Sequence, residues 1–306
     1  MQDFDLVVIG AGVAGLTAAT FAARHGLKVA VVERMAAGGQ IVNAESIENF
    51  PGFPAGIAGH ELGPLLHEQA EAAGAELRLD SVEAMELSGA HRVVHGAADV
   101  WRARAVIVAA GSAPRALGIP GEAQLRGRGV SHCAACDGPL FAGQDVCVVG
   151  GGDSALDEAL VLARHAARVM VFHRDASFDA QQALVDEAVA SPRIELALET
   201  SIEEILGGDA VSGVRLRTRG TNASRIQNVR GVFVHVGLVP NTAFLRGLLA
   251  LDATGHIETD IALRTSVEGI FAAGDIRAHS VAQLAAAAGD GATAAIAAIR
   301  YLKQRG

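Results

Sequence analysis

Short apolar runs alternate along the chain with glycine-rich turns and with helix-like stretches of mixed polarity. Two segments repeat this order in register, Asp5–Arg34 and Asp145–Arg174. Each predicts an apolar strand, a glycine turn, a helix that begins at the turn, and a second apolar strand. Because this is the βαβ order of a dinucleotide-binding unit, the pattern predicts an α/β protein with two Rossmann-like units.

The glycine turns of the two segments match each other residue by residue. Aligned with an offset of 140 residues, they pair Gly10 with Gly150, Gly12 with Gly152, and Gly15 with Ala155. In such a turn the first glycine permits the tight bend and the second lets a pyrophosphate approach the backbone. The third small residue packs helix against strand, and the helix N-terminus meets the phosphate charge. Two such turns in register predict two dinucleotide sites.

The residues that end the second strand of each segment differ. Glu33 ends it in the first segment, where a carboxylate can accept hydrogen bonds from a ribose 2′-OH and would repel a 2′-phosphate. This marks the first site as one for the adenosine end of FAD or NAD, with an incidental surface carboxylate as the alternative. His173 stands at the matching position of the second segment.

The rest of the chain predicts one domain inserted into another. Pro- and Gly-rich stretches at 113–122 and 237–242 read as crossings between domains. We therefore expect one discontinuous domain at 1–114 and 243–306, and an inserted domain at 115–242. Further expected elements are a helix at 59–73, alternating segments at 76–87 and 91–98, and strands at 105–111, 194–198, 214–219, 232–236 and within 268–275.

Composition narrows the function classes. The net charge is −9, without a basic run, which argues against nucleic acid as a partner. No apolar run reaches the ~18 residues of a membrane span. A strand begins by Leu6 and leaves no room for a signal peptide. We expect a soluble, cytoplasmic protein of two domains.

Three cysteines are present: Cys133, Cys136 and Cys147. Cys147 lies in an apolar strand and reads as a buried small side chain. Cys133 and Cys136 form a C-x-x-C, whose sulfurs can meet across one turn, and this spacing indicates redox chemistry or a metal. Zinc would need two more soft ligands, so we expect no metal. Asp137 is either a proton donor and acceptor for the dithiol or a helix cap.

Two further stretches are candidates for ligand contact. Gly274-Asp275 follows an apolar strand, and its carboxylate could contact a flavin nucleotide or simply cap the turn. The long polar loop Gly38–Gly52 directly follows the strand that ends in Glu33, and long ordered loops commonly hold ligands.

Taken together, these motifs resemble those of the low-molecular-weight thioredoxin reductases over nearly the whole chain. In order they are GAGVAG, GGQ, ENFPG, LGIPGE, CAACDG, GGGDSALDEA, GVFVHVGLVPNT and TSVEGIFAAGD. The resemblance implies an FAD-dependent pyridine nucleotide-disulfide oxidoreductase, usually a homodimer. Electrons would pass from NAD(P)H through FAD to a Cys133–Cys136 disulfide, with Asp137 as acid/base, and on to thioredoxin or a thioredoxin-like protein. Cys136 would face the flavin, and the inserted domain would rotate between two poses.

The resemblance also assigns cofactor contacts. FAD would be bound by Gly10, Gly12, Ala14, Gly15, Glu33, Gly39, Gln40, Asn49, Gly111, Gly274, Asp275 and Gln283. The nicotinamide nucleotide would be bound by Gly150, Gly152, Asp153, Ser154, Ala155, His173, Arg174 and Asp175.

The chain departs from the family where NADPH would be recognised. Members that use NADPH have His-Arg-Arg after the second strand and another Arg four residues later. Here the stretch reads His173-Arg174-Asp175, with Asp179 at the last position, so aspartates replace both later arginines. The grip on the 2′-phosphate is therefore lost in this reading, and Asp175 would suit a bare ribose diol. In addition, Ala282 replaces an Arg beside Gln283, and Ala110 replaces a Thr before Gly111.

Three functions follow from these observations. The leading one is a thioredoxin reductase fed by a nicotinamide nucleotide. The alternative keeps flavin and dithiol but receives electrons from ferredoxin or passes them to oxygen as a dithiol oxidase. A flavin-bearing redox sensor without turnover is the third, and the C-x-x-C-Asp ahead of the second unit speaks against it.

Overall fold

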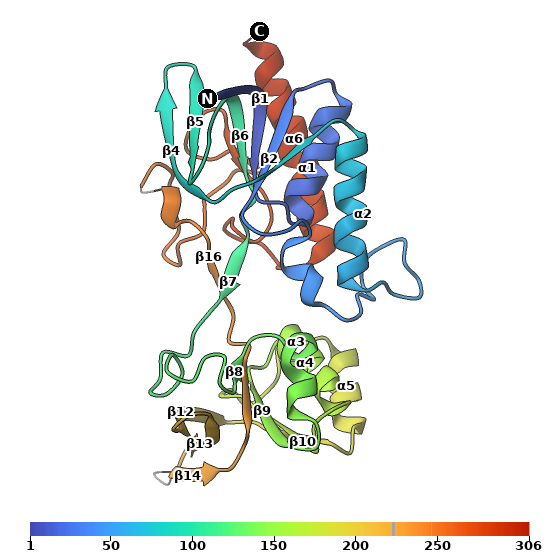
Figure 1. The fold of residues 1–306 in the computed structure, drawn as a ribbon, viewed down its shortest axis with the longest axis vertical. Helices are drawn as coiled ribbons and strands as arrows, with labels where there is room; N and C mark the ends of the chain where they lie inside the picture. Colours follow the sequence, from blue (N-terminus) through green and yellow to red (C-terminus); the bar gives the residue numbers. More distant parts are fainter. Residues whose placement is uncertain (222–223, 246, 306) are drawn as a thin grey trace. The chain divides into compact units, whose positions relative to one another are not determined.

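The computed structural model describes residues 1–221, 224–245 and 247–305. The chain forms two compact units, unit 1 at Met1–Ala113 and Val239–Gly306, and unit 2 at Pro114–Leu238 (Figure 1). The crossings lie at 113/114 and 238/239, whereas the sequence placed them at 114/115 and 242/243. The chain leaves unit 1 through β7 (Ser112–Pro114) and returns to it through β16 (Leu238–Pro240). These two strands pair with each other, so the two crossings lie next to each other.

A seven-stranded sheet forms the centre of unit 1, in the order β3-β2-β1-β6-β5-β4, with β17 also paired to β6. Strands β1, β2, β3, β6 and β17 are parallel, and β5 is antiparallel to both of its neighbours. The bounds are β1 (Gln2–Ile9), β2 (Val29–Glu33), β3 (Glu76–Leu79), β4 (Val82–Ser88), β5 (His91–Gly96), β6 (Val100–Val108) and β17 (Ile270–Ala272).

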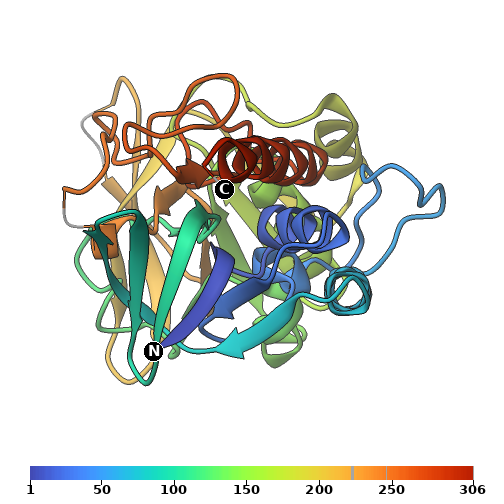
Figure 2. The same cartoon turned by 90° about the horizontal axis from the view of Figure 1, so that it is seen from above.

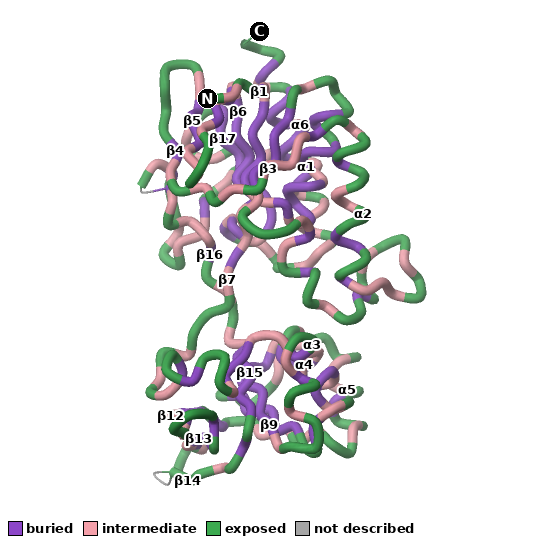
Figure 3. Tube along the Cα trace, in the orientation of Figure 1, coloured by how far each residue is buried: buried purple, intermediate pink, exposed green. Residues whose placement is uncertain are grey.

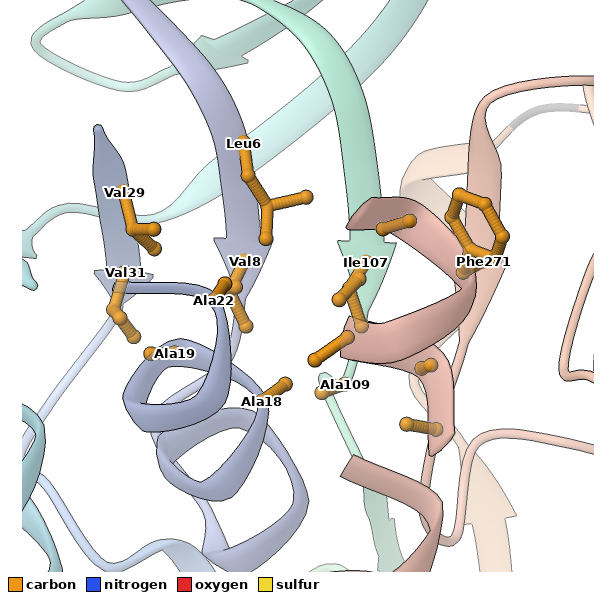
Figure 4. Close-up of a cluster of buried hydrophobic side chains, with 14 of the residues drawn as sticks. Leu6, Val8, Ala18, Ala19, Ala22, Val29, Val31, Ile107, Ala109 and Phe271 are labelled. Atoms are coloured by element: carbon orange, nitrogen blue, oxygen red, sulfur yellow. The ribbon is translucent and has the colours of Figure 1, made fainter. Parts of the chain in front are cut away.

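Helices cover one face of this sheet: α1 (Val13–Arg24), α2 (Gly59–Ala72) and α6 (Leu284–Gln304). Their small side chains pack on the apolar strand residues around Leu6, Val8 and Ile107 (Figure 4). Helices α1 and α6 run side by side, blue and red in Figures 1 and 2. A Cβ on Gly291 of α6 would lie 2.2 Å from the carbonyl oxygen of Ala14, so glycine permits this close approach. Short 3-10 turns lie at η1 (Gly39–Asn43) and η3 (Ala243–Leu245).

The segment 76–87, expected as a stretch of alternating residues, is two strands separated by a turn at Asp80-Ser81. The Asp80 carboxylate accepts backbone hydrogen bonds from Ser81 and from residues 97–99, at distances from 2.7 to 3.1 Å for the shortest contact of each. Because these bonds hold the chain in a turn, the alternation of apolar residues could not continue as one strand. Helix α6 was not among the elements expected from the sequence.

Unit 2 is built on a five-stranded parallel sheet in the order β11-β10-β9-β15-β8. Its strands are β8 (Val130–Ser131), β9 (Asp145–Val149), β10 (Arg168–Phe172), β11 (Ile194–Ala197) and β15 (Gly231–Val234). Helices α3 (Ala134–Asp137), α4 (Asp153–Ala163) and α5 (Gln182–Ala190) accompany it, with the 3-10 turn η2 (Gly138–Phe141). A separate antiparallel sheet contains β12 (Thr200–Gly207), β13 (Val211–Thr218) and β14 (Ser224–Gln227).

The central strands of both units are buried on both faces, as the purple segments of Figure 3 show. Continuous apolar strands of this kind are typical of parallel sheets covered on two sides. Both units therefore have the α/β architecture that the repeated segments predicted, with the second unit inserted into the first. Within the described residues, no helix has the length and apolar character needed to cross a membrane.

Candidate redox and nucleotide-binding sites

A cavity of about 540 Å³ opens in unit 1 at the carboxyl ends of the parallel strands. This volume lies within the usual range of ligand pockets, about 300–1,000 Å³. Most residues predicted to bind FAD line the cavity: Gly10, Gly12, Ala14, Glu33, Gly39, Gln40, Gly111, Gly274 and Asp275. The fold thus brings together residues from five separate stretches of the chain.

The first glycine turn has the backbone that a pyrophosphate requires. Gly10 has φ 103°, and a Cβ there would lie 2.4 Å from the carbonyl oxygen of Ala109. A Cβ on Gly15 would lie 1.9 Å from the carbonyl oxygen of Gly10, so this residue allows α1 to pack on the turn. A Cβ on Gly12, the residue before α1, would meet no atom within 4 Å. The backbone at Gly12 is therefore open to the cavity, beside a helix N-terminus that favours anions.

Glu33 is fixed by backbone hydrogen bonds at the end of β2. Its Oε2 accepts from the N–H of Ala11 at 2.8 Å, and its Oε1 accepts from the N–H of Met35 at 3.0 Å. A carboxylate with two oxygens has lone pairs left after these bonds. Its position in the cavity wall suits the hydroxyl groups of a ribose.

The position of Asp275 is compatible with both interpretations that the sequence left open, a ligand contact and a bond within its own turn. It lines the cavity, and its Oδ1 accepts a hydrogen bond from the Ser280 hydroxyl within the same turn, at 3.0 Å. Burial raises the pKa of this carboxyl, and the Ser280 hydrogen bond opposes that effect. Gly274 has φ 75° and donates its N–H to Asp290, which also binds the Arg277 guanidinium.

Asn49 and Gln283 pair with each other, although 234 residues separate them. The Asn49 amide donates to Gln283 Oε1 at 3.2 Å. These two residues and Gly15 are absent from the cavity wall in the described part of the chain. Gln40, in contrast, lines the cavity and donates its Nε2 to the carbonyl oxygen of Ser112 at 3.1 Å.

Sequence reasoning missed two parts of the cavity wall. Asp80, Ser81 and Val82 come from the turn after β3, and Asn241, Ala243 and Phe244 come from the returning segment. The first group could have been found, because β3 neighbours β2 and the carboxyl ends of parallel strands share one edge. No local signal marked the second group.

In unit 2, Cys133 and Cys136 form a disulfide with a Cα–Cα distance of 5.4 Å. Cys133 precedes α3, and its Sγ accepts a hydrogen bond from the N–H of Cys136 at 3.1 Å. Asp137 is held beside this dithiol, since its Oδ2 accepts from the Ser131 hydroxyl at 2.6 Å, and Ser131 Oγ accepts from the N–H of Cys133 at 3.1 Å. The Asp137 side chain makes no capping bond to η2, the helix that it precedes.

Cys147 lies in β9, where it is fully buried, and burial raises the pKa of its thiol. It therefore has the packing role that the sequence indicated. No three side chains of His, Cys, Asp or Glu gather as metal ligands among the residues that the structure describes.

The second glycine turn repeats the backbone of the first. Gly150 has φ 148°, and a Cβ there would lie 2.1 Å from the carbonyl oxygen of His235. A Cβ on Gly152 would meet no atom within 4 Å. Gly151 differs from its counterpart Ala11, because a Cβ there would lie 2.3 Å from Nδ1 of His173. The His173 ring is thus packed on the turn, and only glycine leaves room for it.

The predicted nucleotide residues at the start of α4 have different surroundings. Ser154 is exposed, and Ala155 is buried against the turn. The Asp153 carboxylate accepts two hydrogen bonds from Gln181, from its N–H and from its Nε2, both at 2.7 Å. Because Gln181 precedes α5, Asp153 holds the N-terminus of that helix and presents a carboxylate that is already engaged.

Three charged or titratable side chains directly follow β10. His173 is buried, Arg174 is 83% exposed, and the Asp175 Oδ2 lies 3.3 Å from Arg174 Nε and 3.7 Å from His173 Nε2. Further on, the N–H of Asp179 donates to the carbonyl oxygen of Gly151 at 2.9 Å. This hydrogen bond folds the segment after β10 back onto the glycine turn, and brings a second aspartate to it.

Comparisons with known proteins agree with this geometry. Residues 4–292 match the sequence profile of the family described as "Pyridine nucleotide-disulphide oxidoreductase". A thioredoxin reductase of Treponema pallidum (strain Nichols) is 42% identical over 98% of this chain and 97% of its own. The crystal structure of Lactococcus lactis thioredoxin reductase (FR conformation) superposes with a TM-score of 0.96 at 37% identity, covering 98% of this chain and 99% of that one.

Two further solved structures are informative. The thioredoxin reductase of T. acidophilum gives a TM-score of 0.95 at 34% identity, with 100% of both chains covered. A ferredoxin-flavin thioredoxin reductase from Clostridium acetobutylicum gives a TM-score of 0.55 at 27% identity, covering 100% of this chain and 99% of that one.

Proposed function

Since the chain belongs to the pyridine nucleotide-disulphide oxidoreductase family, as a thioredoxin reductase-like flavoprotein, we propose that it reduces a thioredoxin or thioredoxin-like protein with electrons from NADH. The observation that carries this proposal is the Cys133–Cys136 disulfide, held beside Asp137 in the unit that contains the second glycine turn. The family implies FAD and a pyridine nucleotide as cofactors. The identity of the donor, the protein substrate and the expected homodimer are part of the proposal.

The cavity of unit 1 fits FAD by its chemistry. Gly12 offers open backbone at the start of α1 for the pyrophosphate, and the fixed carboxylate of Glu33 would bind the ribose hydroxyls. Asp275 and Gln40 would contact the flavin half, as the resemblance implies. When bound, FAD accepts two electrons from a reduced nicotinamide and can pass them to a disulfide.

The end of β10 favours NADH over NADPH. Arg174 is the one cation among the charged groups described there, and Asp175 and Asp179 add two anions. A 2′-phosphate carries about two negative charges, so it would meet repulsion and few donors. A bare ribose diol could instead donate hydrogen bonds to Asp175, in the way that Glu33 serves the first nucleotide.

The reduced dithiol would act by thiol–disulfide exchange. A thiolate of the pair attacks a sulfur of the partner's disulfide, which forms a mixed disulfide and releases a thiolate on the partner. The second cysteine then attacks the mixed disulfide, restores the Cys133–Cys136 bond and releases the partner as a dithiol. Asp137, fixed by Ser131, is placed to supply the proton that the leaving thiolate needs.

A second candidate keeps the flavin and the dithiol but changes the electron source. The Asp153 carboxylate at the start of α4 is engaged by Gln181, and the segment after β10 folds onto Gly151. Both features reduce the space and the positive field offered to a nucleotide phosphate. A reductase fed by ferredoxin, or a dithiol oxidase that passes electrons to oxygen, would tolerate them.

Anaerobic reduction of the FAD-loaded protein separates these candidates. The oxidised protein is mixed with NADH, with NADPH, or with dithiothreitol, and flavin absorbance is followed. We expect prompt bleaching by NADH and much slower bleaching by NADPH. Bleaching by dithiothreitol but by neither nucleotide would overturn the NADH proposal and favour another electron source. Reduction of a thioredoxin at the expense of NADH, followed by its free thiols, tests the partner.

A further inference from the structure

Two largely buried titratable side chains lie next to the backbone between the two redox cysteines, and the mechanism above does not use them. Glu158 of α4 accepts a hydrogen bond from the N–H of Ala134, a residue between the two cysteines. Its Oε2 also lies 3.7 Å from Nε2 of His235, which follows β15. The side chains of Glu158 and His235 are only 15% and 11% exposed. They form a pair within unit 2, in contact with the backbone of the dithiol.

The geometry of this pair calls for one proton between its members. His235 Nε2 is buried and has no hydrogen-bond partner among the described residues. An ionised carboxylate and a bare imidazole nitrogen are both acceptors, so they would leave each other unsatisfied. A proton on either one turns it into a donor to the other, and a small side-chain rotation would close the 3.7 Å separation to a hydrogen bond.

The pKa values indicate that the carboxyl group, rather than the neutral imidazole ring, is the member of the pair that takes up an additional proton. Burial raises the pKa of Glu158 to about 7; the Ala134 hydrogen bond opposes this effect and the nearby Asp157 adds to it. Burial lowers the pKa of His235 to about 4, and His132 adds to that effect. His132 directly precedes Cys133 and donates its Nδ1–H to the carbonyl oxygen of Val234 at 2.8 Å. Near neutral pH, His235 is therefore neutral, and Glu158 is the member of the pair whose charge changes.

We propose that the Glu158 carboxylate takes up a proton when the Cys133–Cys136 disulfide is reduced. His235 is the hydrogen-bond partner of the protonated carboxyl group. This inference rests on the proposed function only in requiring that the disulfide be reducible. The titratable groups that act on the pair are Asp157, next to Glu158, and His132, before α3, whereas Asp137 is held by Ser131 beside the disulfide.

The proton balance gives the physical reason. When a dithiol reduces the protein, the Cys133–Cys136 bond breaks and a disulfide forms in the reductant. One proton of the reductant goes to a cysteine thiol and the other goes to Glu158, while the second cysteine remains a thiolate. One negative charge is lost at the carboxylate and one is gained at sulfur. The half-buried surroundings of the dithiol thus avoid an additional anion at the Glu158 carboxylate, which contacts the backbone between the two cysteines.

The test measures the redox equilibrium of the FAD-loaded protein against dithiothreitol from pH 6 to 8.5, without oxygen. Thiols are trapped by alkylation and counted, and the pH dependence of dithiothreitol itself is subtracted. Above about pH 7, uptake of a proton by Glu158 should make the equilibrium constant for reduction of the Cys133–Cys136 disulfide fall an extra tenfold per pH unit. For a two-electron couple this corresponds to about 30 mV per pH unit. Glu158→Gln keeps the acceptor for Ala134 and should lose this component. Glu187→Gln, which removes an exposed carboxylate of α5, should keep it.

Infrared difference spectra of the wild type provide a readout that does not depend on a variant's stability. Reduction at pH 7.5 should increase the C=O stretch of a protonated carboxyl, with a shift in D₂O. Glu158→Gln should lack this band, and His235→Phe should move the pH at which it appears. An unchanged pH profile in Glu158→Gln, or no carboxyl band in the wild type, would overturn the inference while leaving the proposed function intact. A disulfide that dithiothreitol cannot reduce at any pH would overturn both.

Discussion

Replacing Asp175 with arginine should shift the nucleotide preference of unit 2 from NADH toward NADPH. The Asp175 side chain is 53% exposed and lies at the end of β10, beside Arg174 and His173. Because the side chain is exposed, its charge interactions are screened by water, and the dielectric constant of water applies to them. The substitution removes one anion and adds one cation next to the place where the 2′-phosphate would lie.

The size of the effect can be worked out from charge and distance. At ~6 Å in water, one pair of unit charges contributes ~0.7 kcal/mol. A change of two charges against a phosphate of about −2 makes four such contributions, and salt at physiological strength reduces the sum roughly twofold, to ~1.4 kcal/mol. A charge-assisted hydrogen bond from the new guanidinium adds ~1.5 kcal/mol. The total of ~3 kcal/mol corresponds to about a 100-fold change in the ratio of affinities.

Rapid mixing without oxygen measures this ratio. Flavin bleaching is recorded at a series of NADH and NADPH concentrations, and the apparent Kd of each nucleotide is taken from the concentration dependence. Glu187→Arg makes the same charge change on the exposed surface of α5 and should leave the ratio within about twofold. If Asp175→Arg alters both nucleotides equally, or if the wild type already prefers NADPH, the assignment of Asp175 to the ribose is refuted.

Four further substitutions test other parts of the structure. Cys136→Ser should abolish reduction of protein disulfides while the flavin spectrum remains, and residual turnover would show that another group carries the electrons. Glu33→Gln should weaken FAD binding about tenfold through loss of a charged hydrogen bond, measured by flavin fluorescence on dilution, and unchanged affinity would place the ribose elsewhere. Gly151→Ala should displace the His173 ring and lower the free energy of unfolding by ~1–3 kcal/mol in urea, an effect that His173→Ala should suppress. Burial raises the pKa of Glu158 from its ordinary 4.5 to about 7, so its stabilising contribution is full below pH 4.5 and is lost as pH rises through 7. Glu158→Gln should therefore gain stability relative to the wild type between pH 5 and pH 8, by ~2–3 kcal/mol, and a difference that does not depend on pH would contradict the burial argument.

The sequence predicted those features that local backbone geometry demands. Gly10 and Gly150 adopt positive φ at turns where a Cβ would collide with a neighbouring strand, so their spacing was visible before the fold was known. Glu33 could be found because it ends the strand after the turn. The organisation in two units could likewise be predicted from the repeat, since each copy supplies two neighbouring strands of a separate sheet, β1 and β2 in unit 1 and β9 and β10 in unit 2.

Features that depend on distant parts of the chain were not predictable in the same way. Asn241 reaches the cavity on the returning segment, and its side chain donates to the carbonyl oxygen of Ala110 at 2.8 Å. Glu158 of α4 and His235, the residue after β15, come within 3.7 Å of each other although 77 residues separate them, and each residue alone reads as an ordinary polar position. Pairings of this kind depend on strand order and helix rotation, which a pattern of apolar residues does not specify.

The inequality of the two copies can be traced to the middle residue of each glycine turn. In the first copy, the N–H of Ala11 donates to Glu33, so the strand-end carboxylate is fixed in the cavity and a Cβ on Ala11 is accommodated. In the second copy, the His173 ring occupies the space over Gly151, and no side chain larger than glycine fits beneath it. Any carboxylate offered to a nucleotide ribose must then come from a later residue, and Asp175 is the first one available. The His173 ring at this position therefore accounts for Gly151. If the proposed function holds, it also explains why Asp175, rather than the residue at the strand end, would set the nucleotide preference of unit 2.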